Sequence, residues 1–205
     1  MSRCERRHTW CRALVAGSAL LLWPWCTEAH LVTTGLGPVY DGIGHLLVTP
    51  EDLLPVLALA LFAGLRGASA GRRVLCVLPL AWLVGGGVGL LAPWLPALPS
   101  PALSFLILGT LVATDLRLPP TAVMALAIGL GLLHGCLNGV AMQQAGAGVL
   151  GLLGILAALF VLVALVAAYV VSLQRPWTRI VVRVAGSWIT AVGLLMLGWS
   201  LRGTL

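Results

Sequence analysis

Residues 147–173 read AGVLGLLGILAALFVLVALVAAYVVSL, a stretch that contains no charged side chain. A helix that crosses the hydrocarbon core of a bilayer needs about 20 consecutive apolar residues. This stretch is long enough to span a membrane as a single helix. It therefore indicates that the chain is an integral membrane protein.

The composition of the whole chain supports the same class. The 205 residues are 60% hydrophobic and 9% charged, with a mean hydropathy of +1.06, whereas a soluble domain has about 25% charged residues. Such a chain has too few charges to cover a surface in water, which excludes a soluble enzyme, a nucleic-acid-binding domain and a disordered chain. The bilayer is the expected partner. The net charge of +6 predicts no nucleic-acid partner, because its arginines lie in short loops rather than on one basic face.

Hydropathy predicts the number of spans. Beyond residue 30, six apolar runs are separated by short loops, and they lie at residues 44–66, 73–95, 101–118, 121–142, 147–173 and 179–201. We therefore expect an all-α, polytopic transmembrane helix bundle of about six spans. It would form a single domain over residues 30–205.

The first 29 residues have the pattern of a cleavable signal peptide. Four arginines come first, the apolar run Ala13 to Trp25 is short for a span, and Thr27-Glu28-Ala29 resembles a cleavage site. Cleavage after Ala29 would make His30 the first residue of the mature chain. The alternative is an uncleaved first helix.

The remaining arginines predict the orientation. All but Arg202 fall in the first, third and fifth loops between the six runs, at positions 66, 72, 73, 117, 175, 179 and 183. The positive-inside rule places these loops in the cytoplasm. The predicted protein lies in a bacterial inner membrane with its mature N-terminus outside, which agrees with an exported signal.

Glycines recur at a spacing of four residues in the run 121–142. Gly131, Gly135 and Gly139 would form a bare backbone stripe along one helix face, which allows a neighbouring helix to approach closely. The alternative is that membrane helices are rich in glycine in general.

A few polar side chains remain as candidates for a site, because an ionisable group is expensive to bury in a membrane. His45 lies close to Glu51 and Asp52 near the expected outer face, and His134 lies in the outer half of its run with Asn138 one helical turn further. Imidazole and carboxylate ligands suit divalent ions such as nickel, cobalt or zinc. The predicted metal-contacting residues are His45, His134, Glu51, Asp52 and His30, with Asn138 and Asp41 in support.

Each of these residues also has a purely structural explanation. Thr49 with Pro50 and Asp52 is typical of a helix start, in which acidic residues stabilise the first turn. A histidine on an apolar helix face, such as His134, is often a hydrogen-bonded packing residue.

Two segments resemble motifs of a known family. Residues 42–47, GIGHLL, followed by residues 51–54, EDLL, are similar to the opening motif of the HupE/UreJ family, and residues 133–141, LHGCLNGVA, resemble its second motif. Arg183, Gly186 and the run 193–195 resemble its closing helix. The resemblance implies a hydrogenase- or urease-associated membrane protein that acts as a nickel permease or accessory protein. It also implies a cleaved signal and a mature N-terminal histidine, which His30 matches.

The two motifs also depart from the family pattern. Thr49, Glu51 and Asp52 stand where the family has glycine, aspartate and histidine, while Asn138 and Ala141 replace a histidine and a glutamate. Two hypotheses follow. The chain is a nickel or cobalt permease or metal-delivery protein, or it is a non-transporting membrane accessory protein that binds membrane or metalloenzyme-maturation partners and has lost the metal site.

Catalysis is not expected. The serines have no histidine base at a readable spacing, and neither a Gly-x-Ser-x-Gly motif nor a nucleotide-binding loop is present. The sequence predicts no catalytic residue and no firm cofactor, only Ni²⁺ or Co²⁺ as an ion bound or transported.

Overall fold

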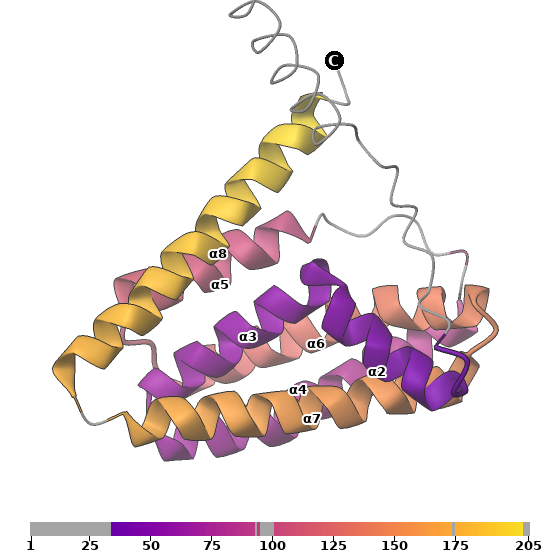
Figure 1. Cartoon of the computed structure of the whole chain (residues 1–205), viewed down its shortest axis with the longest axis horizontal. Helices are drawn as coiled ribbons and strands as arrows, with labels where there is room; N and C mark the ends of the chain where they lie inside the picture. The colour runs from indigo at the N-terminus through magenta and orange to yellow at the C-terminus, as the bar shows by residue number, and fades with distance from the viewer. Residues whose placement is uncertain (1–33, 93, 95–100, 174, 203–205) are drawn as a thin grey trace, which may run out of the picture. The chain divides into compact units, whose positions relative to one another are not determined.

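The structure is a computed structural model that describes residues 34–92, 94, 101–173 and 175–202. All regular elements within these residues are α-helices (Figure 1). They are α2 (Pro38–Val48), α3 (Pro50–Leu65), α4 (Ala68–Leu91), α5 (Ala102–Thr114), α6 (Pro120–Gln144), α7 (Gly148–Ser172) and α8 (Pro176–Arg202). The predicted signal peptide, residues 1–29, and His30 lie outside the described residues.

Four of these helices, α4, α6, α7 and α8, are long and apolar enough to cross a membrane. The pair α2 and α3 makes a fifth candidate when the two are taken together as one bent span. The third predicted span, residues 101–118, contains only the 13-residue helix α5, which is about 20 Å long and shorter than the core of about 30 Å. The described residues therefore support four to five spans rather than six.

Helix α5 is short because the chain cannot stay helical at its C-terminal end. Asp115 closes the helix in the left-handed conformation, with φ 53°, which aspartate tolerates better than most residues. Pro119 and Pro120 follow, and Pro120 begins α6. Because a proline disfavours helical backbone in the residue before it, the segment between α5 and α6 is extended.

The bend between α2 and α3 has a similar origin. The two helices meet at 73°, and Thr49 between them adopts an extended conformation with φ −94° and ψ 98°. Pro50 has no N–H to donate and its ring restricts Thr49, so α2 ends at Val48. The same proline suits the first position of the next helix.

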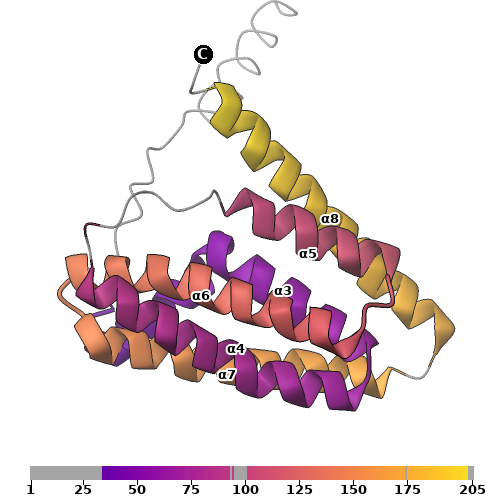
Figure 2. The same ribbon diagram turned by 180° about the vertical axis from the view of Figure 1, so that it is seen from behind.

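Helix α3 occupies the centre of the bundle. Helices α4, α6 and α7 pack against one another on one side of it, and α5 packs extensively against α8 on the other (Figures 1 and 2). Helix α2 packs against α7. Because α3 contacts both groups, it links them into one unit.

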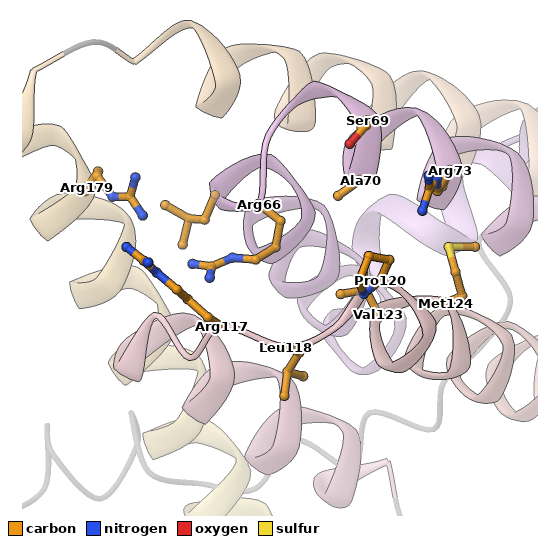
Figure 3. A pocket seen from close by; sticks show the side chains of 11 residues that line it. Arg66, Ser69, Ala70, Arg73, Arg117, Leu118, Pro120, Val123, Met124 and Arg179 are labelled. Atoms are coloured by element: carbon orange, nitrogen blue, oxygen red, sulfur yellow. The ribbon is translucent and has the colours of Figure 1, made fainter.

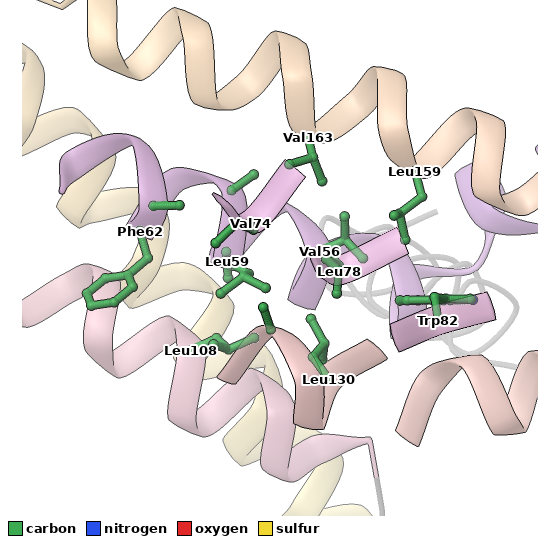
Figure 4. Close-up of a cluster of buried hydrophobic side chains, with 14 of the residues drawn as sticks. Val56, Leu59, Phe62, Val74, Leu78, Trp82, Leu108, Leu130, Leu159 and Val163 are labelled. Atoms are coloured by element: carbon green, nitrogen blue, oxygen red, sulfur yellow. The ribbon is translucent and has the colours of Figure 1, made fainter. Parts of the chain in front are cut away.

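The core of the bundle forms around the same helix (Figure 4). Val56, Leu59 and Phe62 of α3 are fully buried, and Leu78 and Trp82 of α4 lie in the same cluster. Many apolar side chains on the outer faces of α7 and α8 are exposed instead. A helix that is apolar on every face is expected where lipid, rather than water, surrounds the protein.

The glycine stripe of α6 lies against α4. A Cβ atom added at Gly135 would lie 2.4 Å from the carbonyl oxygen of Trp82, and one added at Gly139 would lie 2.2 Å from that of Gly86. Only glycine permits this approach of the two backbones. The stripe thereby fixes the position of His134 and Asn138, which occupy the preceding positions on α6.

Candidate functional site

Five buried polar side chains from four helices meet in the interior, and we refer to them as the polar cluster. His45 lies in the last turn of α2 and Asp52 in the first turn of α3, while Ser104 comes from the start of α5. His134 and Asn138 lie one turn apart on α6. Their exposed fractions range from 0% for His134 to 9% for His45 and Ser104.

Asp52 is the centre of the polar cluster. Its Oδ1 lies 2.8 Å from Nδ1 of His134, and its Oδ2 accepts a hydrogen bond of 2.9 Å from the side-chain amide of Asn138. The same amide nitrogen also donates to the backbone carbonyl of His134, at 2.9 Å. A carboxylate removed from water needs such partners, because burial without them is very costly.

His134 uses both ring nitrogens. Nε2 lies 3.0 Å from the hydroxyl oxygen of Ser104. When Asp52 is ionised, the neutral imidazole donates from Nδ1 to the carboxylate, and Nε2 accepts from the hydroxyl; these bonds define the tautomer. The ring of Trp82 lies beside it, with centroids 5.8 Å apart, so that the imidazole is held on every side.

The side chains of His45 and Asn138 interact with each other and with Asp52, and each carries an atom that could serve as a metal ligand. Nε2 of His45 lies 3.8 Å from Oδ2 of Asp52, which is too long for a hydrogen bond. Oδ1 of Asn138 is buried and has no hydrogen-bond partner among the described residues. Since buried polar atoms are usually satisfied, this oxygen is a place where the site can accept a ligand.

The depth of the polar cluster follows from helix length. Arg66 and Pro120 line one pocket at the same end of the bundle. Asp52 and His134 each lie 14 residues from that end, which corresponds to about 21 Å of helix. This length is about two thirds of the thickness of a hydrocarbon core of about 30 Å.

The other predicted site residues lie elsewhere. Glu51 is exposed, because it precedes Asp52 by one residue and points to a different helix face. Asp41 accepts hydrogen bonds from the backbone N–H and the hydroxyl of Thr34, at 2.6 and 2.7 Å, at the start of α2. These bonds give Asp41 a structural role.

Ser104 has a histidine partner that no readable spacing in the sequence indicates. Its partner, His134, belongs to another helix 30 residues further along the chain, so that no spacing within one helix could reveal it. The order serine, histidine, aspartate matches the connectivity of a hydrolase triad. However, the adjoining groove of about 280 Å³ is lined by aliphatic residues apart from Ser104 and presents no donors for an oxyanion.

The polar cluster is not a preformed metal centre. Within the described residues, no three histidine, cysteine, aspartate or glutamate side chains are grouped so that they could hold a metal ion. The physical reason is visible in the bonds above, because Asp52 and His134 direct their donor atoms at each other. Metal contact by His45, His134, Glu51, Asp52 and His30 stays a prediction.

These features define a multi-pass α-helical membrane protein with a buried carboxylate and imidazole cluster beside a bent helix pair. The family model described as HupE / UreJ protein matches residues 18–196. The chain belongs to the HupE/UreJ family, which confirms the resemblance found in its motifs. No curated protein and no solved structure matches the chain.

Proposed function

We propose that the chain handles Ni²⁺ or Co²⁺ in the membrane, as a permease or as a metal-delivery protein, and that the ion contacts the polar cluster. Membership of the HupE/UreJ family supports an accessory or permease-like role in general. The observation that carries the proposal is the buried carboxylate of Asp52 between the imidazoles of His45 and His134. Imidazole and carboxylate are suitable ligands for these ions.

The break between α2 and α3 supports a cation at this place. Discontinuous helices in transporters expose backbone carbonyls at the C-terminal end of one half, and these carbonyls coordinate cations. Helix α2 ends at Val48, directly beside the polar cluster. Asp52 meanwhile lies in the first turn of α3, where the positive end of the helix dipole interacts favourably with an acidic side chain.

The distances favour transient contact over tight storage. Bonds of about 2.1 Å place two neighbouring ligands of a tetrahedral or octahedral ion roughly 3–3.5 Å apart. The 3.8 Å between His45 Nε2 and Asp52 Oδ2 requires only a small closure, and Oδ1 of Asn138 would supply a third donor. A site with few strong ligands releases its ion readily, as transport demands.

The arginine-bearing end indicates the direction of passage. By the positive-inside rule this end faces the cytoplasm of a bacterial inner membrane, which places the mature N-terminus outside. The polar cluster, about 21 Å from that end, would then be reached from the outer face.

The experiment compares metal uptake by cells that express the full chain or its variants. We expect Asp52→Asn and His45→Gln to lower Ni²⁺ and Co²⁺ accumulation at least tenfold, because the loss of one ligand commonly costs that much in metal affinity. Ser187→Ala serves as the matched control, since its hydroxyl bonds only its own helix, to the carbonyl of Arg183. Glu51→Gln tests which carboxylate acts. An equal loss in Glu51→Gln would assign the ion to the exposed acid instead.

The alternative is a membrane accessory protein without transport activity. It is favoured by one observation, namely that Asp52 and His134 already satisfy each other. Under this alternative, Asp52→Asn destabilises the protein in detergent, whereas metal accumulation is the same with and without the wild-type chain. That result would overturn the permease proposal.

A further inference from the structure

A second pocket lies about 21 Å from the polar cluster, at the arginine-bearing end of the bundle (Figure 3). Its volume is about 390 Å³, and four arginines line it: Arg66, Arg73, Arg117 and Arg179. They come from the first, third and fifth loops or the helix turns beside them. The side chains of Leu118 and Met124 contribute an apolar wall.

The positive charge of this pocket is only partly neutralised. The carboxylate of Asp115 binds Arg66 through Oδ1 and Arg179 through Oδ2, the latter at 2.8 Å. Arg73 and Arg117 have no ion-pair partner within the described part of the chain. The other acids described, at positions 41, 51 and 52, belong to α2 and the first turn of α3, away from this end.

Arg66 keeps one unused N–H donor beside its ion pair with Asp115. Its side chain is 11% exposed, and its Nε is buried without a hydrogen-bond partner among the described residues. Burial lowers the pKa of Arg66, and the nearby charges of Arg179 and Arg117 lower it further. A bound anion would relieve this repulsion and accept the unused N–H.

We propose that this pocket binds the phosphate group of an anionic phospholipid. Guanidinium groups bind phosphate oxygens in a bidentate manner, and basic pockets between transmembrane helices bind lipid head groups. The pocket lies at the helix ends, where head groups are found. Its apolar wall would contact the first part of an acyl chain, which favours a lipid over free phosphate.

The test uses the purified full-length chain in vesicles of phosphatidylcholine, alone or with one quarter phosphatidylglycerol. We expect phosphatidylglycerol to raise the melting temperature by about 2–8 °C, because a ligand that binds only the folded state stabilises it. The variant Arg73→Gln with Arg117→Gln should lose this rise. Both side chains are exposed, so the variant should fold, which its melting temperature in phosphatidylcholine alone verifies.

Two further arms identify the source of the phosphate. Arg175→Gln with Arg202→Gln is the matched control, since it removes the same two charges from exposed side chains that do not line the pocket, and it should keep the full rise. Millimolar inorganic phosphate should have no effect in phosphatidylcholine vesicles. An equal rise with inorganic phosphate would assign the pocket to a soluble anion. An equal loss in Arg175→Gln with Arg202→Gln would show that the effect depends on net charge alone. Either result overturns the proposal, and neither depends on metal uptake.

Discussion

Replacement of Gly139 by alanine should separate α6 from α4. The added Cβ would lie 2.2 Å from the carbonyl oxygen of Gly86 and 2.9 Å from its carbonyl carbon. A carbon and an oxygen atom approach each other to about 3.3 Å. The Cβ atom of alanine would meet the backbone of Gly86, and neither group has a rotamer that could relieve the contact. The two helices must therefore move apart by about 1 Å.

This displacement has two measurable costs. A gap of 0.5–1 Å removes a quarter to a half of the dispersion energy of each contact it opens, and overpacking of this kind lowers the free energy of unfolding by about 1–3 kcal/mol. For a chain of about 200 residues, the melting temperature should fall by about 2–12 °C. The same movement shifts His134 and Asn138 of α6 relative to Asp52 of α3, so that metal accumulation should fall as well under the proposed function.

Gly129 provides the matched control on the same helix. A Cβ added there meets nothing within 4 Å, and alanine is the better helix former by about 0.5–1 kcal/mol. The melting temperature, followed by tryptophan fluorescence in detergent, should therefore rise or stay constant in Gly129→Ala and fall in Gly139→Ala. Equal shifts in the two variants would refute the reasoning, because they would show that packing against Gly86 is unimportant.

Variants at three further positions test other parts of the structure by thermal unfolding. Asp115→Asn keeps a residue that tolerates the left-handed backbone but removes the charge that binds Arg66 and Arg179. We expect the free energy of unfolding to fall by about 1–2 kcal/mol, and by less in high salt. An unchanged free energy of unfolding at low salt would contradict this prediction. Trp82→Phe removes a buried N–H that has no partner in the described structure and should lower the free energy of unfolding by less than about 1.5 kcal/mol. Trp82→Ala should lower it by about 3–5 kcal/mol. Equal losses in the two variants would show that the N–H contributes to stability. Ser104→Ala leaves Nε2 of His134 without its partner and should cost about 1–3 kcal/mol. Labelling of the wild-type Ser104 by a fluorophosphonate would instead identify a nucleophile.

The fold class could be predicted from the sequence because apolar runs are a property of composition over about 20 residues. The HupE/UreJ resemblance could also be recognised from the sequence, because the motifs around His45 and His134 are short and continuous. The match of the family model confirms it. Hydropathy predicted six spans, whereas the described residues support four to five. Residues 101–118 are apolar throughout most of their length, but the left-handed Asp115 limits α5 to 13 residues.

The candidate site was accessible from sequence only in part. His134 and Asn138 lie four residues apart on one helix, so helix geometry alone predicts that they are close. His45 and Asp52 are only seven residues apart in the sequence, but they lie on two helices, and the bend between α2 and α3 brings them together. Which of Glu51 and Asp52 faces the interior depends on how α3 is rotated at the 73° bend. The contribution of Ser104 to the polar cluster depends on how α5 packs against its neighbours. No periodic pattern in the sequence predicts this packing.

The double ion pair of Asp115 has a consequence for how the protein is made. Its two guanidinium partners, Arg66 and Arg179, are separated by more than a hundred residues, and Arg179 belongs to α8, which is synthesised after α2–α7. Until then, α5 is both too short to cross the bilayer and without α8, the helix it contacts most. Helix α5 should therefore dock into the bundle late, once α8 has been synthesised. A chain truncated before residue 176 should accumulate with α5 outside the bundle and be a preferred substrate of membrane proteases.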